Sequence, residues 1–186
     1  LSERSPRALQ QADADDDFSF AIPQMGRFRA NVLHQRGTLA AVLRVIRFGL
    51  PGPAALGIPA QVMDVARQRK GLVLVTGPAG NGKSTTLACL IDAINHEREA
   101  HIITMEDPIE YIHRHNRSIV TQREIGSDAP SYVSALRSAL RESPDVILLG
   151  EMRDLETTEL AMTAPETRQL LFSTLHTSGP ANTIEP

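Results

Sequence analysis

The sequence predicts an α/β fold in which a small antiparallel meander precedes a mostly parallel, doubly wound sheet. Three observations lead to this prediction. Short apolar runs alternate with helix-like segments from residue 59 onward, a pattern typical of parallel sheets covered by helices. A glycine-rich loop at 77–82 joins the first of these runs to the longest helix-like segment. Residues 18–46 instead carry three strand-like segments with no helix between them.

The first 48 residues are expected to be the C-terminal part of a small domain. Strands at 18–22, 26–35 and 38–46 are separated by turn residues, among them Pro23 and Gly37. Residues 49–58 are rich in glycine and proline and predict a linker, and 59–186 would form the α/β domain. The chain begins at leucine rather than methionine, so we expect a fragment, trimmed at both ends.

Within 59–186, apolar periodicity predicts the order of helices and strands. We expect a helix at 59–69, a strand at 71–76, a helix at 83–97, strands at 101–105 and 118–122, a helix at 130–142, a strand at 145–149, a helix at 154–164 and a strand at 170–175.

The segment between the first of these strands and the next helix reads Gly77-Pro-Ala-Gly-Asn-Gly-Lys-Ser84, a complete G-x-x-x-x-G-K-[ST] phosphate-binding loop. Its glycines allow backbone N–H groups to turn inward around a phosphate, and the helix that follows adds the positive end of its dipole. Lys83 is suited to the β- and γ-phosphates and Ser84 to Mg²⁺. The loop predicts a site for ATP and Mg²⁺ formed by Gly77, Pro78, Ala79, Gly80, Asn81, Gly82, Lys83, Ser84 and Thr85.

Composition excludes several other classes of function. A net charge of −3 offers no basic stripe for direct nucleic-acid binding. No apolar run approaches the roughly 20 residues that span a bilayer, and no signal-peptide pattern opens the chain. A single cysteine, Cys89, rules out an internal disulfide and fits a reducing cytoplasm.

Polar residues follow three of the predicted strands, and ligands of doubly wound sheets bind at the carboxyl ends of the strands. Glu106 follows strand 101–105, Glu151 follows strand 145–149, and His176 follows strand 170–175. We expect Glu106 to orient or deprotonate the attacking water and Glu151 to hold the Mg²⁺ water shell. His176 is placed to contact a γ-phosphate, whereas Asp145 begins its strand and belongs at the opposite edge.

These segments resemble the boxes of the type II/IV secretion ATPase superfamily. Thr104-Met-Glu-Asp-Pro-Ile-Glu-Tyr111 is similar to its aspartate-rich box, and Gly150-Glu151 to its atypical Walker B pair. Ser173-Thr-Leu-His-Thr177 is similar to the second half of its histidine box. Gln122-Arg-Glu-Ile-Gly126 looks closest to PilT-type twitching-motility ATPases. The resemblance implies a RecA-like core, a hexameric ring, a motor for type IV pilus retraction, and a cytoplasmic protein attached to the inner membrane through a pilus or secretion platform protein.

The same resemblance gives the meander a role. Gly26-Arg-Phe-Arg-Ala-Asn31 and Ala40-Ala-Val-Leu-Arg-Val-Ile46 are similar to the end of a PAS-like N-terminal α+β domain. There the family supplies arginines that reach the nucleotide phosphates, and these match Arg29 and Arg44. A guanidinium suits this role because its planar fork stays charged and binds phosphate oxygens in pairs.

The chain also departs from the family pattern. Pro165 replaces a usual alanine and should end the preceding helix early, because proline lacks an N–H. Arg168 and Gln169 stand where the family has Gly-His, so the first histidine of the histidine box is missing. A hydrolysis-poor ring or regulatory subunit is therefore an alternative to a motor, as is a type II secretion or pilus assembly ATPase.

Overall fold

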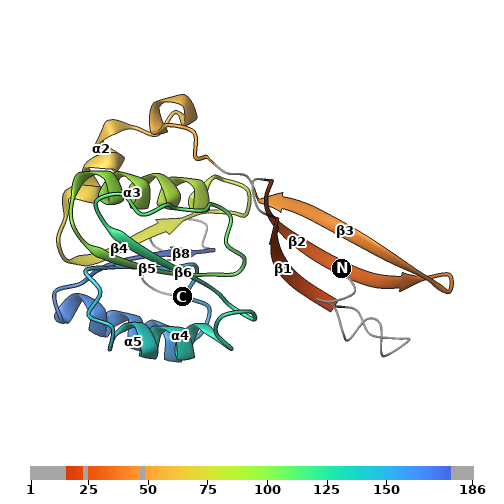
Figure 1. The fold of residues 1–186 in the computed structure, drawn as a ribbon. Coiled ribbons are helices and arrows are strands. Elements are labelled where there is room, and N and C mark those ends of the chain that lie inside the picture. The colour runs from red at the N-terminus through yellow and green to blue at the C-terminus, as the bar shows by residue number, and fades with distance from the viewer. Residues whose placement is uncertain (1–15, 23–24, 47–48, 177–186) are drawn as a thin grey trace. The chain divides into compact units, whose positions relative to one another are not determined.

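The computed structural model describes residues 16–22, 25–46 and 49–176, and it divides the chain into two compact units, Leu1–Phe48 and Gly49–Pro186. Figure 1 shows an antiparallel ribbon in the first unit and a sheet between helices in the second. Within the described residues, no helix has both the length and the apolar character that crossing a membrane requires. The predicted α/β fold class is confirmed.

The first unit is a three-stranded antiparallel sheet in the order β1-β2-β3. Its strands are β1 (Asp16–Ile22), β2 (Gly26–Gln35) and β3 (Thr38–Ile46). Opposed residues of an antiparallel pair share a face. Phe20 lies opposite Phe28 and their rings stack at 5.4 Å, which marks the apolar face. Arg29 lies directly opposite Arg44, so these two guanidinium groups share the other face.

The second unit contains a five-stranded parallel sheet in the order β4-β8-β7-β5-β6. Helix α3 (Lys83–Glu97) lies on one side of the sheet, and α4 (Tyr132–Ala139) and α5 (Leu155–Glu166) lie on the other (Figure 1). Side chains such as Leu90 and Phe172 fill the first layer, and Leu136 and Leu149 fill the second. The strands are β4 (Gly71–Thr76), β5 (His101–Glu106), β6 (Ile119–Glu124), β7 (Val146–Leu149) and β8 (Leu170–Leu175).

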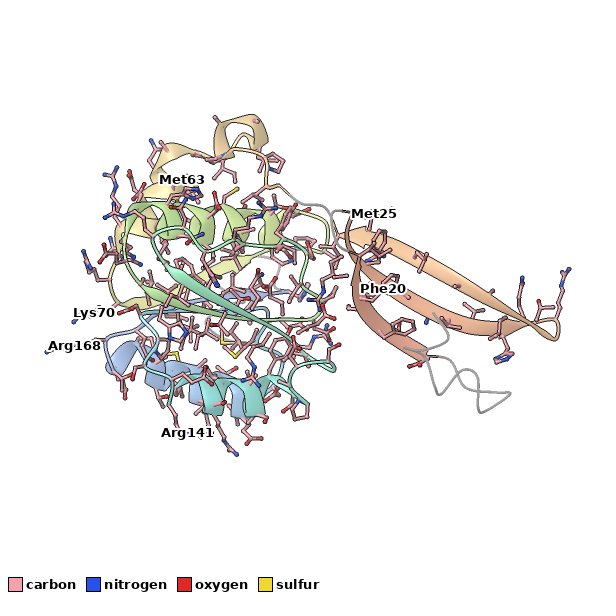
Figure 2. The ribbon with its side chains drawn as sticks, in the orientation of Figure 1. Phe20, Met25, Met63, Lys70, Arg141 and Arg168 are labelled. Carbon is pink, nitrogen blue, oxygen red and sulfur yellow. The ribbon has the colours of Figure 1, made fainter. Side chains whose placement is uncertain are left out.

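The strands end in register. Thr76 pairs with Leu175, Met105 with Leu149, and Glu106 with Glu124. The residues that follow β4, β5, β7 and β8 therefore meet at one edge, as the sequence predicted. At the opposite edge, Lys70 and Arg168 precede β4 and β8, and both lie at the amino ends of the strands in Figure 2.

Two of the expected helices are shorter than predicted. The expected helix at 59–69 is broken into α2 (Ala60–Met63) and a 3-10 turn, η2 (Asp64–Arg67), and a further 3-10 turn, η1 (Pro53–Leu56), lies inside the predicted linker. Neither α2 nor η2 has a side-chain cap at its start, which leaves the segment without the hydrogen bonds that begin a longer helix. The helix expected at 130–142 begins at Tyr132 and ends at Ala139.

Pro165 does not end α5 early, contrary to the sequence prediction. The helix runs through Pro165 to Glu166. Proline lacks the N–H that would bond to the carbonyl of Ala161 four residues earlier, but the loss of one hydrogen bond leaves the rest of the last turn in place. That turn closes with the tighter bonds common at helix ends, since Thr167 N donates to Ala164 O at 3.1 Å and Arg168 N to Pro165 O at 3.3 Å.

Candidate active site

The phosphate-binding loop connects β4 to α3 through backbone that only glycine adopts readily. Gly77, Gly80 and Gly82 have φ values of 140°, 82° and 80°. Lys83 opens α3 and its ammonium donates to the carbonyl oxygens of Gly77, at 2.8 Å, and Pro78, at 2.9 Å. The Lys83 side chain thus lies over the loop, where its ammonium would be next to a bound phosphate.

A cavity of about 400 Å³ opens at the carboxyl edge of the sheet, in front of this loop. It brings together residues from five segments that are distant in the sequence. Its lining includes Ala79, Gly80, Gly82, Lys83, Ser84, Thr85, Leu87, Ala88, Glu106, Asp107, Pro108, Glu110, His113, Tyr132, Leu148, Gly150, Glu151, Arg153, Thr174 and His176.

Glu106, the last residue of β5, lies in the wall of the cavity. Its Oε1 accepts hydrogen bonds from Thr104 Oγ1 at 2.6 Å and from Gln122 Nε2 at 3.3 Å. Burial raises the pKa of the Glu106 carboxyl above its usual range, although the hydrogen bonds from Thr104 and Gln122 oppose this. A carboxylate with a raised pKa is a better proton acceptor, which suits a general base.

Glu151 lies between two basic side chains. Its Oε2 is 2.8 Å from Arg153 Nε and 3.5 Å from His176 Nε2, and its side chain is only 11% exposed. The sequence placed Glu151 and His176 after neighbouring strands, and the structure brings them into direct contact. The ion pair of Arg153 with Glu151 was not predicted, because nothing in the sequence distinguishes Arg153 from a solvated arginine.

Gly150 holds the ends of β5 and β7 close together. Its N–H donates to Met105 O at 2.8 Å, and its carbonyl accepts from Thr174 Oγ1 at 2.7 Å. A Cβ at this position would lie 2.9 Å from Tyr132 Oη and 3.1 Å from Met105 O. The glycine of the Gly-Glu pair is therefore required by space, and it positions Glu151 next to β5.

Sequence reasoning missed the residues that surround the predicted ones. Tyr132 lines the cavity, and burial together with the nearby Glu151 raises the pKa of its phenol. Tyr111 Oη lies 3.1 Å from Thr85 Oγ1, which links the segment after β5 to the first turn of α3. The sequence drew attention to Gln122 only as part of a motif and did not predict its contact with Glu106. The pairing of Gln122 with Thr104 between the parallel strands β5 and β6 is the feature that reveals this contact.

Oxygen ligands suitable for Mg²⁺ are present in the cavity, since Ser84 and Glu151 both line it. Across the described part of the chain, no three His, Cys, Asp or Glu side chains gather into a metal site of their own. Arg29 and Arg44 belong to the other unit, so their relation to this cavity stays a prediction.

Comparisons with known proteins point in one direction. The family model for "Type II/IV secretion system protein" matches residues 14–185. A twitching motility protein of Neisseria gonorrhoeae is 48% identical over 179 residues, which are 96% of this chain and 48% of that protein. The type IV pilus retraction ATPase PilT of Pseudomonas aeruginosa is 49% identical over 171 residues, or 92% of this chain and 50% of PilT.

Solved structures agree with the sequence relatives. The crystal structure of the pilus retraction motor PilT with bound ADP superposes with a TM-score of 0.92 at 52% identity, and the match covers 99% of this chain and 53% of that one. The ATPase DotB of Legionella pneumophila matches with a TM-score of 0.76 at 30% identity, covering 97% of this chain and 52% of that one. The chain thus spans about half the length of the relatives that it matches.

Proposed function

Because the chain belongs to the type II/IV secretion system protein family, we propose that it is part of a Mg²⁺-dependent ATPase, a motor subunit of a hexameric ring that drives type IV pilus retraction. One observation carries this proposal: the phosphate-binding loop, Glu106 and Glu151 line the same cavity. The named activities of the twitching motility protein and of PilT support the choice of pilus retraction.

The residues divide the work of hydrolysis among them. Backbone N–H groups of the loop and the N-terminus of α3 would hold the phosphates, with the Lys83 ammonium exchanging its carbonyl partners for phosphate oxygens. Glu106 would orient and deprotonate the attacking water, helped by its raised pKa. When bound, Mg²⁺ would neutralise charge on the phosphates, and Ser84 and Glu151 are the residues placed to hold it and its water shell.

His176 is suited to sensing the γ-phosphate. Its Nε2 lies 3.5 Å from Glu151 Oε2 and its side chain remains 51% exposed, so one edge of the ring is accessible from the cavity. A contact to the γ-phosphate would be lost on hydrolysis, which is the kind of differential contact that shifts a conformational equilibrium.

Arg29 and Arg44 would complete the site from the N-terminal unit. They lie opposite each other on one face of the meander, so a single phosphate group would be within reach of both. If they bind the γ-phosphate, the arrangement of the two units depends on the nucleotide, and this is how hydrolysis would produce movement.

We further propose that the intact protein acts in the cytoplasm, is a homo-oligomer and meets a pilus or secretion platform protein at the inner membrane. A type II secretion or pilus assembly role is the alternative within the family, since a type II secretion system protein E of Xanthomonas campestris is 44% identical over 124 residues.

The missing first histidine of the histidine box is the observation that favours a hydrolysis-poor subunit. Gln169, which replaces it, is buried immediately before the amino end of β8, whereas His176 follows the carboxyl end. At about 3.3 Å per residue, the six residues of β8 separate these positions by roughly 20 Å. The replacement therefore leaves the cavity of this chain intact, which favours the hydrolysing motor.

The test is phosphate release by the intact protein, with and without Mg²⁺, compared among wild type, Glu106→Gln and Glu151→Gln. We expect Mg²⁺-dependent release in the wild type and a loss of about 10²–10⁴-fold in Glu106→Gln, the usual scale for a general base. Glu151→Gln should instead weaken the binding of Mg-ATP, so that more Mg²⁺ is needed to reach the same rate. If Glu106→Gln weakens Mg-ATP binding and Glu151→Gln only slows turnover, the two carboxylates have the opposite roles. If the wild type releases no phosphate, the protein is not an ATP-hydrolysing motor.

A further inference from the structure

The amide side chain of Gln122 makes three hydrogen bonds behind the lining of the cavity. Its Nε2 donates to Tyr111 O at 2.9 Å and to Glu106 Oε1 at 3.3 Å, and its Oε1 accepts from His113 N at 2.8 Å. A backbone carbonyl only accepts and a backbone N–H only donates, so these partners permit one orientation of the amide. Gln122 therefore holds both ends of the segment 111–113 and the Glu106 carboxylate at the same time.

Tyr111 extends this connection to the phosphate-binding loop. Its hydroxyl lies 3.1 Å from the hydroxyl of Thr85. Thr85 is in the first turn of α3, two residues after Lys83. A continuous path thus runs from Glu106 through Gln122 and Tyr111 to the helix that carries the phosphate ligands.

We propose that Gln122 is a positioning residue for ATP hydrolysis, which fixes the Glu106 carboxylate relative to α3 and its phosphate-binding loop. This proposal rests on the function proposed above. A general base works only if its oxygen meets the attacking water at the right distance and angle, and a displacement of about 1 Å can cost roughly 10²-fold in rate. Gln122 supplies this constraint from outside the cavity lining, through hydrogen bonds alone.

The chemistry of the amide explains why glutamine is needed. A glutamate would still accept from His113 N, but it has no donor for Tyr111 O and would bring a second carboxylate to Glu106. A methionine has similar length and no hydrogen bond to give. Both replacements should leave Lys83 and the loop untouched, so the rate should fall while the binding of ATP persists.

The same contact affects the protonation of Glu106. The hydrogen bonds from Thr104 and Gln122 lower the pKa of Glu106, while burial and the nearby charge of Glu110 raise it. Removing the Gln122 donor leaves the raising effects less opposed. Because the base must be ionised to act, the acid limb of the rate profile should move to higher pH.

The experiment measures kcat, KM for ATP and the pH dependence of kcat in the intact protein carrying Gln122→Met, Gln122→Glu or Tyr111→Phe. Thr121→Val is the matched control, since its hydroxyl lies on the same strand but contacts His101 Nε2 at 3.3 Å, at the other end of β5. We expect kcat to fall by about 10–100-fold in both Gln122 variants, with KM for ATP within about threefold of wild type. Tyr111→Phe should show a smaller fall, and Thr121→Val should match the wild type.

Each outcome is decisive. If wild-type protein hydrolyses ATP and Gln122→Met keeps both its kcat and its pH profile, the positioning role is wrong while the proposed function stands. If the wild type does not hydrolyse ATP, both are wrong. If Gln122→Met fails to fold by circular dichroism, the same comparison is made with Gln122→Glu, which keeps the size and polarity of the side chain. Equal losses in Thr121→Val would also overturn the proposal, because they would reflect general damage to β6.

Discussion

Replacing Gly150 by alanine is expected to damage both stability and hydrolysis. The added Cβ would lie 2.9 Å from Tyr132 Oη, 3.1 Å from Met105 O and 3.4 Å from Glu106 Cα. The first distance is too short for any real contact, and the second involves the backbone of β5, which cannot rotate away. The chain must therefore shift by a few tenths of an ångström at the residue that precedes Glu106.

The magnitude follows from what such crowding costs. Forcing one extra methyl group into a filled site typically costs about 1–3 kcal/mol. For a chain of this size each kcal/mol lowers Tm by roughly 2–4 °C, so Gly150→Ala should unfold roughly 2–12 °C below wild type. Because β5 moves with Glu106 attached, kcat should fall by at least about tenfold.

The assay compares thermal unfolding and phosphate release in Gly150→Ala, Tyr132→Phe and the double variant. Tyr132→Phe removes the atom at 2.9 Å, so the double variant should regain part of the lost stability. Gly52→Ala is the control, because nothing lies within 4 Å of a Cβ there and φ is −60°. Equal unfolding temperatures and rates in Gly150→Ala and Gly52→Ala would show that the contacts at Gly150 do not require glycine.

Three further predictions concern charge. Burial raises the pKa of Glu106 in the folded state, so its contribution to folding stability is fully present below its unfolded pKa and is lost as the pH rises through its folded pKa. Thermal scans should therefore show Glu106→Gln more stable than wild type at about pH 8 and equal to it near pH 4. Asp154 caps α5 by accepting a hydrogen bond from Thr157 N at 2.7 Å, and this bond lowers the pKa of Asp154. Asp154→Ala should therefore lower Tm at neutral pH and much less in acid, where the carboxylate is protonated in the wild type. An unchanged Tm at neutral pH would contradict the capping role. Arg29→Ala and Arg44→Ala should each slow steady-state hydrolysis strongly without changing ADP affinity in calorimetry, and wild-type rates in both would leave the meander a structural appendage.

Local patterns in the sequence were sufficient for the elements that carry the site. The glycine loop and α3 were predicted with their observed boundaries, because apolar periodicity and glycine spacing are local properties of the chain. The predicted family is confirmed by the matching family model. The grouping of Glu106, Glu151 and His176 followed from a general rule, that the carboxyl ends of parallel strands share one edge.

What the sequence did not reveal depends on pairing between distant segments. Gln122 reaches Glu106 only because β6 lies beside β5 in a register that opposes Gln122 to Thr104. The contact between Tyr111 and Thr85 depends on the course of the segment after β5. Pro165 was misjudged because a proline removes only its own hydrogen bond, to the carbonyl four residues earlier, and so need not end the helix, which here continues to Glu166.

The most direct test of the central assignment is calorimetric titration of the intact protein with Mg-ATP. Lys83→Ala removes the ammonium beside the loop, and Lys70→Ala removes an exposed ammonium that precedes β4 at the opposite edge of the sheet (Figure 2). We expect Lys83→Ala to lose most of its affinity for the triphosphate and Lys70→Ala to bind like the wild type, since only Lys83 would exchange carbonyl contacts for phosphate. Unchanged Mg-ATP affinity in Lys83→Ala would contradict the assignment of residues 77–84 as the nucleotide site.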